Sequence, residues 1–199
     1  MAVFMTSGGT RPKRSTFVNY IASSGAQYID TGFKLNQNTR VVMDCQAYSV
    51  DSGGSFPFGV RAGLNSKAFT VALTESQVFY NYASAYKFAD FSGVTERMTI
   101  DANKNVATFK GSTTTTITLD SGTFTCDSNL LIATASNGGV AYTGAAAWVG
   151  AIYSCQIYDN GTLIRDFVPA IDSNGEVCLY DKVNEKYYYN AGTGKFIGG

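Results

Sequence analysis

Histidine is absent from this chain of 199 residues. Without an imidazole, neither a Ser-His-Asp triad nor a Cys-His pair can form, and histidine-based metal sites are excluded as well. A net charge is missing too, because 15 basic residues cancel 15 acidic ones. No global electric field therefore attracts nucleic acid or an anionic membrane surface, and we expect neither as a partner.

Long apolar runs are also missing. No stretch approaches the roughly 20 apolar residues that a membrane span requires. The first six residues, Met-Ala-Val-Phe-Met-Thr, lack both the basic start and the apolar segment of a secretion signal. We therefore expect synthesis in a cytoplasm, so that any extracellular role depends on release or assembly.

Cysteine is scarce and scattered. The four cysteines, Cys45, Cys126, Cys155 and Cys178, form no Cys-x-x-Cys pair. With no histidine to help, a zinc site would need all four thiols to converge, which strands this far apart rarely allow. We interpret the four residues as buried free thiols.

Apolar and aromatic residues are plentiful: 45% of the chain is apolar, with 13 tyrosines and 13 phenylalanines. Aromatic residues suit strands, and no segment shows a convincing 3.6-residue apolar period. The pattern predicts roughly a dozen strands at spacings of about 8–12 residues, which is typical of a sandwich. The clearest expected strands cover residues 39–48, 56–61, 68–73, 77–82, 105–110 and 163–168. The predicted fold class is all-β, a two-sheet antiparallel β-sandwich.

The C-terminal part of the chain predicts a β-meander. Residues 151–158 alternate between two strand faces, and Asp159-Asn160-Gly161 supplies residues that tolerate the positive φ of a tight hairpin turn. The partner strand over 163–168 is expected to end at Pro169, because proline cannot donate to a strand ladder. A second hairpin is expected over 176–190.

The remaining boundaries follow from turn residues and polarity. Residues 1–16 are polar, basic and rich in breakers, so we expect a flexible N-terminal arm before one domain over 17–199. Within that domain, Leu130–Ala135 is expected to be one short central strand. Asn137–Gly144 is expected to be a flexible loop, and Ala145–Tyr158 to re-enter the sheet.

Two sets of residues carry a resemblance to a known family. The C-terminal set comprises Ala151–Asn160, Arg165-Asp166-Phe167-Val168-Pro169, Gly175 through Leu179-Tyr180-Asp181, Tyr188-Tyr189-Asn190 and Gly194-Lys195-Phe196; the N-terminal set is Tyr20–Gly32. These segments resemble the two ends of concanavalin A-like (LamG-like) jelly-roll domains, of the type found in phage virion proteins and gut-bacterial surface proteins. The resemblance brackets nearly all of the chain from Phe17 onward and implies a jelly roll.

Enzymes of this jelly-roll type include glucanases, which need two carboxylates about 5–5.5 Å apart for a retaining mechanism. Such enzymes place the acids on one strand, as Glu-x-Asp-x-x-Glu or Glu-x-Asp-x-Glu. The four glutamates of this chain, Glu75, Glu96, Glu176 and Glu185, have no such arrangement. We therefore predict that the chain is not an enzyme.

Glycan sites typically combine an aromatic platform with amide hydrogen-bond partners. The candidate ligand-binding residues are Tyr142, Trp148, Tyr86, Asn81 and Asn137. Trp148 also fits a core position, because it lies between an alanine-rich run and Val149, whereas Tyr142 lies in a glycine-rich segment that favours exposure.

Calcium is common in LamG-like relatives, and Asp51 beside Ser52 and Gly53 offers one oxygen ligand. One acidic loop residue does not make a metal site, so no cofactor is predicted.

The preferred hypothesis is a non-enzymatic phage virion module, in a capsid decoration, tail or fibre, that binds carbohydrate on the host or its surroundings. One alternative is a purely structural assembly or decoration protein, whose partners are other virion proteins or further copies of this chain. A glucanase-like glycoside hydrolase is the least favoured alternative.

Overall fold

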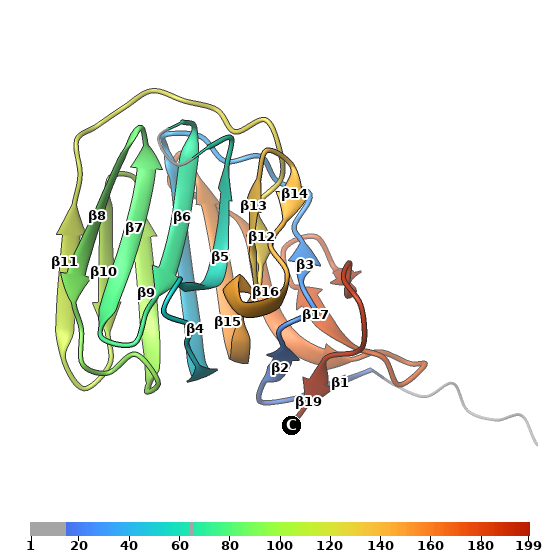
Figure 1. Cartoon of the computed structure of the whole chain (residues 1–199). Helices are drawn as coiled ribbons and strands as arrows, with labels where there is room; N and C mark the ends of the chain where they lie inside the picture. The colour runs from blue at the N-terminus through green and yellow to red at the C-terminus, as the bar shows by residue number, and fades with distance from the viewer. Residues whose placement is uncertain (1–14, 64–65) are drawn as a thin grey trace, which may run out of the picture.

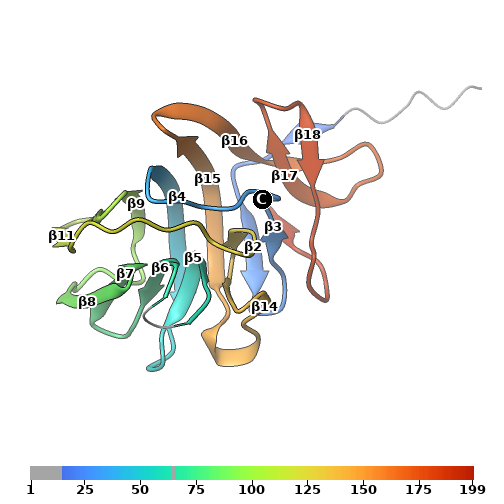
Figure 2. The ribbon, with the colours of Figure 1, turned by 90° about the horizontal axis from the view of Figure 1, so that it is seen from above.

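The computed structural model describes residues 15–63 and 66–199 and shows two β-sheets packed face to face (Figure 1). Seen from above, β9 and β4 run in one layer and β7 and β6 in the other (Figure 2). Within the described residues the only helical segment is a 3-10 turn, η1 (Gly144–Ala146). The expected all-β, two-sheet sandwich is confirmed; among the strands that the structure describes, the pairs are antiparallel except for the parallel pair of β13 and β5.

The larger sheet, here called sheet A, contains both ends of the domain. Its main strands, in spatial order, are β11 (Thr114–Thr118), β10 (Val106–Lys110), β9 (Arg97–Asn103), β4 (Thr39–Ser49), β15 (Val149–Asp159), β16 (Thr162–Ile171), β17 (Val177–Asp181) and β18 (Lys186–Tyr188). Three short strands join them: β1 (Thr16–Phe17) pairs with β16, and β2 (Ile21–Ser24) pairs with both β15 and β19 (Ile197–Gly198).

The second sheet, sheet B, is built mostly from the middle of the chain. Its strands, in spatial order, are β14 (Val140–Ala141), β13 (Ala135–Asn137), β5 (Ser55–Arg61), β6 (Ala68–Leu73), β7 (Gln77–Ala83) and β8 (Ala85–Asp90). The short strand β12 (Leu131–Ile132) links β5 to β3 (Ile29–Asp30).

The core lies between the two sheets and follows from residue alternation. On β4, Val41, Met43 and Cys45 are fully buried, whereas Val42 and Asp44 between them are half-exposed. The largest fully buried side chains are Trp148, Tyr80, Phe58, Phe69, Phe109 and Phe167. Burying one phenylalanine side chain contributes about 1.5–3 kcal/mol, so these rings dominate the stability of the sandwich.

All four cysteines are buried and unpaired, as expected from the sequence. Desolvation raises the pKa of the Cys126 and Cys178 thiols to about 12. Burial also raises the pKa of Cys45 and Cys155 far above its ordinary value. The thiols therefore stay protonated near neutral pH and act as small apolar side chains.

The hairpin between β15 and β16 turns at Asn160 and Gly161, whose φ angles of 49° and 81° confirm the expected two-residue turn. The expectation that Pro169 ends the next strand is wrong, because β16 continues to Ile171 and Pro169 pairs with Leu179. Its carbonyl accepts the Val18 N–H, so its nitrogen also points toward β1 and away from the β17 ladder. The missing N–H therefore costs no bond to β17.

Two further expectations need correction. Residues 130–135 form parts of two strands, because Ala133 adopts a left-handed φ of 65° and reverses the chain between β12 and β13. The expected loop over 137–144 contains β14, and residues 145–148 precede β15 instead of belonging to it.

Most of the expected N-terminal arm, residues 1–14, lies outside the described residues. Its last residue, Thr16, is in β1. No helix among the described residues is long and apolar enough to cross a membrane.

Candidate functional site

The outer face of sheet A, turned away from the core, is polar. The side chains between the buried residues of each strand point outward. They include Arg40, Asp44 and Gln46 of β4, Arg97, Thr99, Asp101 and Asn103 of β9, Thr108 and Lys110 of β10, and Gln156 and Tyr158 of β15. This polar face offers hydroxyl, amide, guanidinium and carboxylate groups on paired strands.

At one end of this face, three turns meet around a hollow of about 750 Å³, here called the asparagine hollow. Its lining residues are Asn38, Arg40, Asp101, Asn103, Lys104, Asn105, Val106, Thr108, Tyr158, Asn160 and Gly161. The strand order explains the convergence. Because β4 lies between β9 and β15 and is antiparallel to both, the start of β4, the β9–β10 turn and the β15–β16 turn lie at the same end of the sheet.

An ion pair sits in the wall of the asparagine hollow. The Arg40 Nε and Nη2 atoms donate to the two carboxylate oxygens of Asp101 at 2.8 and 2.6 Å. The hydrogen bond to Asp101 raises the pKa of Arg40 above its ordinary value, so the guanidinium stays charged. The same guanidinium lies 5.3 Å from the centre of the Tyr158 ring, since Tyr158 is its cross-strand partner on β15. The ion pair is therefore held from both neighbouring strands.

The asparagines supply the hydrogen-bonding capacity of the hollow. Each side-chain amide carries two donor hydrogens and an acceptor oxygen. Asn105 donates to the Leu119 carbonyl at 2.7 Å. The amides of Asn38 and Asn103 have no hydrogen-bond partner within residues 15–63 and 66–199, yet both line the hollow. They are therefore available to a polar ligand without breaking an existing contact.

The residues predicted from the sequence lie elsewhere, and four of the five belong to the outer face of sheet B. The Tyr142 ring stacks on Phe56 at a centroid distance of 5.1 Å, and the Arg61 guanidinium bonds to the Tyr142 hydroxyl. Asn137 pairs with Arg61 across β13 and β5. Their proximity, close to the edge of sheet B, was not evident from the sequence.

Tyr86 and Asn81 are cross-strand partners on β8 and β7 of the same face. Tyr86 is 44% exposed, whereas Asn81 is fully buried. Tyr86 can therefore reach a ligand, while Asn81 cannot offer its amide at the surface. Tyr142, Tyr86 and Asn137 remain predicted ligand contacts.

The prediction that Trp148 is a ligand platform is wrong, because the side chain is 0% exposed and belongs to the main core. Its neighbour Gly150 explains the fit. A Cβ atom on Gly150 would lie only 2.9 Å from the indole ring and 2.2 Å from the Gln46 carbonyl oxygen. Glycine at this position lets the indole and β4 approach the β15 backbone closely.

Sheet B also carries an apolar cluster on its outer face, separate from the main core. Its buried members are Phe56, Ala72, Phe79 and Ala135. Beside them, Tyr86 and Phe88 are 44% and 45% exposed and lie against the Phe79 ring. We call Phe56, Phe79, Tyr86, Phe88 and Tyr142 the aromatic face of sheet B.

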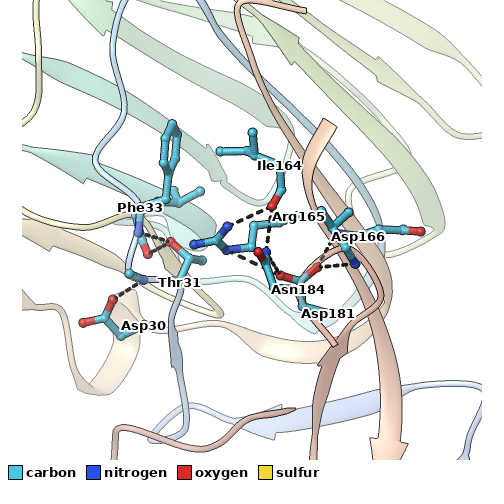
Figure 3. Close-up of polar contacts among 11 residues, drawn as sticks. Asp30, Thr31, Phe33, Ile164, Arg165, Asp166, Asp181 and Asn184 are labelled. Atoms are coloured by element: carbon cyan, nitrogen blue, oxygen red, sulfur yellow. Dashed lines mark hydrogen bonds and ion pairs between the residues drawn. The ribbon is translucent and has the colours of Figure 1, made fainter. Parts of the chain in front are cut away.

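The buried polar cluster around Asp181 has a structural role. The Asp181 carboxylate is fully buried and accepts hydrogen bonds from the backbone N–H groups of Asp166 and Val183 and from the Asn184 amide, at 2.9, 3.1 and 2.6 Å (Figure 3). The Arg165 Nε atom lies 3.6 Å from the same carboxylate. These contacts join β16 to the turn after β17 and leave Asp181 inaccessible to a ligand.

In residues 15–63 and 66–199, no group of three or more His, Cys, Asp or Glu side chains converges as metal ligands. The Asp51 carboxylate, the one candidate calcium ligand, accepts the Gly53 N–H at 2.8 Å and so shapes its own turn.

No family model and no curated protein sequence matches the chain. Among solved structures, domains LG4-5 of the mouse laminin alpha1 chain match with a TM-score of 0.48 and 11% identity over 82% of this chain, which spans about half (47%) of that chain. The CBM40 of the Ruminococcus gnavus IT-sialidase matches with a TM-score of 0.48 and 14% identity, over 72% of this chain and 90% of that one. The structure of the same CBM40 bound to alpha2,3 sialyllactose matches with a TM-score of 0.46 and 13% identity, over 73% of this chain and 89% of that one.

Proposed function

We propose that the chain is a non-enzymatic carbohydrate-binding module whose glycan lies in the asparagine hollow of sheet A. The observation that carries the proposal is the joint placement of two unpartnered amides, an ion pair and a tyrosine on neighbouring strands around one hollow. Ligand sites characteristically combine a concave surface with a few convergent polar groups.

Glycan chemistry suits this set of groups. A sugar hydroxyl both donates and accepts, and so does each of the amides of Asn38 and Asn103. The ion pair is already formed, so Arg40 and Asp101 need no rearrangement to offer their remaining donor and acceptor positions. Preorganisation of this kind lowers the entropic cost of binding.

Binding without catalysis is supported by the carboxylates. Of the described residues that line the asparagine hollow, only Asp101 carries a carboxylate, and both of its oxygens accept hydrogen bonds from Arg40. A glycosidase of the usual kind needs a second acid close by. Reducing-sugar release from β-glucans that is lost on Asp101→Asn would overturn this part of the proposal.

The test is an array of bacterial polysaccharides followed by calorimetric titration of each glycan that binds. We expect Asn103→Ala to weaken binding roughly twofold to tenfold, the effect of losing a net hydrogen bond of about 0.5–1.5 kcal/mol. Tyr86→Ala on sheet B tests the ligand contacts predicted from the sequence, and a glycan in the asparagine hollow requires that this variant leaves the affinity unchanged. If Tyr86→Ala abolishes binding while Asn103→Ala does not, the glycan site lies on sheet B; silence across the array removes the lectin role.

The setting that we propose is a virion, in which the chain forms part of a capsid decoration, tail or fibre. Support comes from the resemblance of both ends of the chain to domains found in virion proteins. Mass spectrometry of purified particles should detect the chain at a fixed copy number. Its absence from particles, in cells that produce it, would contradict this setting.

A second candidate function is assembly through protein–protein contact, and the aromatic face of sheet B is the observation that favours it. Tyr86 and Phe88 are exposed beside a buried apolar cluster, and a partner surface that covers them would remove their apolar area from water and so stabilise the complex. Light scattering after size-exclusion chromatography tests this: we expect an oligomer that dissociates in Phe88→Glu, and a monomer at high concentration would refute it.

A further inference from the structure

A second ion pair on the outer face of sheet A repeats the one in the asparagine hollow. The Arg97 Nε and Nη2 atoms donate to the two oxygens of Asp44 at 2.9 and 2.7 Å. Arg97 also lies over a tyrosine ring, 3.7 Å from the centroid of Tyr153. Each pair therefore unites an arginine, an aspartate and a tyrosine, and we call the two sets the Arg40 unit (Arg40, Asp101, Tyr158) and the Arg97 unit (Arg97, Asp44, Tyr153).

The two units are related by the strand register. Arg40 lies two residues before Val42, the cross-strand partner of Asp101. Arg97 lies opposite Gln46, two residues after Asp44. In both units the arginine therefore reaches an aspartate on the neighbouring strand that is two positions away from the residue directly opposite. The two units have opposite arrangements: β4 supplies the arginine of the Arg40 unit and the aspartate of the Arg97 unit, and β9 supplies the other two charged residues. Arg40 and Asp44 are four residues apart on one face of β4, which corresponds to about 14 Å at 3.4 Å per residue.

We infer that the two units are the two ends of one binding track, and that its ligand is an uncharged linear glycan long enough to contact both. This inference rests on the proposed function of the asparagine hollow and names the class of glycan that it takes. The track runs along β4 from the Arg40 unit to the Arg97 unit.

The charges of the track favour a neutral ligand. In both units the two oxygens of the aspartate are bonded to the arginine, so the four ionised groups cancel in pairs. An anionic sugar would have to compete with a carboxylate that already holds each guanidinium in a two-point contact. Two lysines remain beside the pairs: Lys104 lies on a turn in the hollow, and Lys110 is the cross-strand partner of Thr99 at the middle of the track. Both are exposed, so solvent and salt screen their charges.

The surface between the units favours an extended ligand. The side chains at the middle of the track, Val42 and Thr99, are short, and the long side chains of the two units flank them at either end. A single sugar ring cannot reach from Asn103, at one end of the track, to Arg97, at the other, because these residues are six positions apart on β9, or about 20 Å at 3.4 Å per residue. A chain of sugars can lie along the strand and donate to or accept from the polar groups at each end.

The experiment measures affinity against ligand length. Calorimetric titrations use neutral gluco-, manno- and N-acetylglucosamine oligosaccharides, each from monosaccharide to hexasaccharide, with polygalacturonate and polysialic acid as anionic probes. The double variant Asp44→Asn/Arg97→Gln removes the charges of the Arg97 unit; asparagine keeps the size of the aspartate, and glutamine keeps a polar but shorter side chain in place of the arginine. We expect wild-type affinity to rise with length for one neutral series, and the double variant to lose about tenfold for the longest member and nothing for the shortest.

The outcomes separate this inference from the proposed function. An affinity that depends on Asn103 but is independent of length and unchanged in the double variant overturns the track and leaves the hollow as a site. Preference for an anionic probe overturns the neutral class. If no oligosaccharide binds the wild-type chain, both the proposed function and the track are refuted. Urea unfolding of the double variant checks that any loss is not a loss of folded protein.

Discussion

The Asp181 carboxylate is the polar group whose removal should damage the fold most. It is fully buried and accepts two backbone hydrogen bonds and one from Asn184, with Arg165 3.6 Å away (Figure 3). In Asp181→Ala, the N–H groups of Asp166 and Val183 lose their acceptor in a site that water reaches poorly. The Arg165 guanidinium, with only 19% of its side chain exposed, loses its counter-charge.

The magnitude follows from the burial. Removing one partner of a buried ion pair typically costs about 3–5 kcal/mol, because the other charge stays buried and uncompensated. With a urea dependence of about 2 kcal/mol per molar, this loss lowers the unfolding midpoint by roughly 1.5–2.5 M. Asp181→Asn keeps the shape and one carbonyl acceptor, so its loss should be smaller than that of alanine.

The assay is urea unfolding followed by circular dichroism and tryptophan fluorescence, since Trp148 in the core reports on global unfolding. Asp127→Ala is the matched control, because it removes an aspartate whose ion pair with Lys67 is shorter, at 2.8 Å, but whose side chain is 71% exposed. We expect the control to change stability by about 1 kcal/mol or less. An Asp181→Ala variant as stable as Asp127→Ala would refute the reasoning.

Three further predictions rest on single positions. Gly150→Ala should destabilise the fold by about 3 kcal/mol or more or prevent folding, because its Cβ would lie 2.2 Å from the Gln46 carbonyl oxygen; urea unfolding checks this. The backbone N–H of Glu176 and further hydrogen bonds lower the pKa of Asp172, so the stability that Asp172 contributes is present above its unfolded pKa and is lost as the pH falls through its folded pKa; wild type and Asp172→Asn should differ near neutral pH and converge in acid. The four buried thiols should react with a thiol reagent only after unfolding, and a fast-reacting thiol in the native protein would contradict their burial.

Local features of the fold were predictable because they depend on neighbouring residues. The segment over residues 39–48 was expected to be a strand, with Val41, Met43 and Cys45 on the face opposite to Asp44 and Gln46, and β4 covers that segment. Asn160-Gly161 specified a two-residue turn with positive φ. Each signal lies within a few residues of chain, so no knowledge of the strand order was needed.

The asparagine hollow could not be predicted because it depends on which strands are neighbours. Asn38, Asn105 and Asn160 lie in three turns far apart in sequence and meet only because β4 pairs with both β9 and β15. The one available signal was that each turn contains asparagine, which turn chemistry alone explains. The prediction that Trp148 contacts a ligand is wrong for a related reason, since the burial of Trp148 depends on the close approach of β4 to Gly150.

The two outer faces of the sandwich are chemically opposite, which argues for two separate contacts. A solvated antiparallel sheet places polar residues outward, and sheet A follows this rule with Arg40 and Asp44. Sheet B departs from it, because Phe79 and Phe88 lie on its outer face. Hydroxyl groups of a glycan match the first face, whereas an apolar partner surface matches the second. Because the two contacts would lie on opposite sheets, Asn103→Ala should leave the oligomeric state unchanged and Phe88→Glu should leave glycan affinity unchanged.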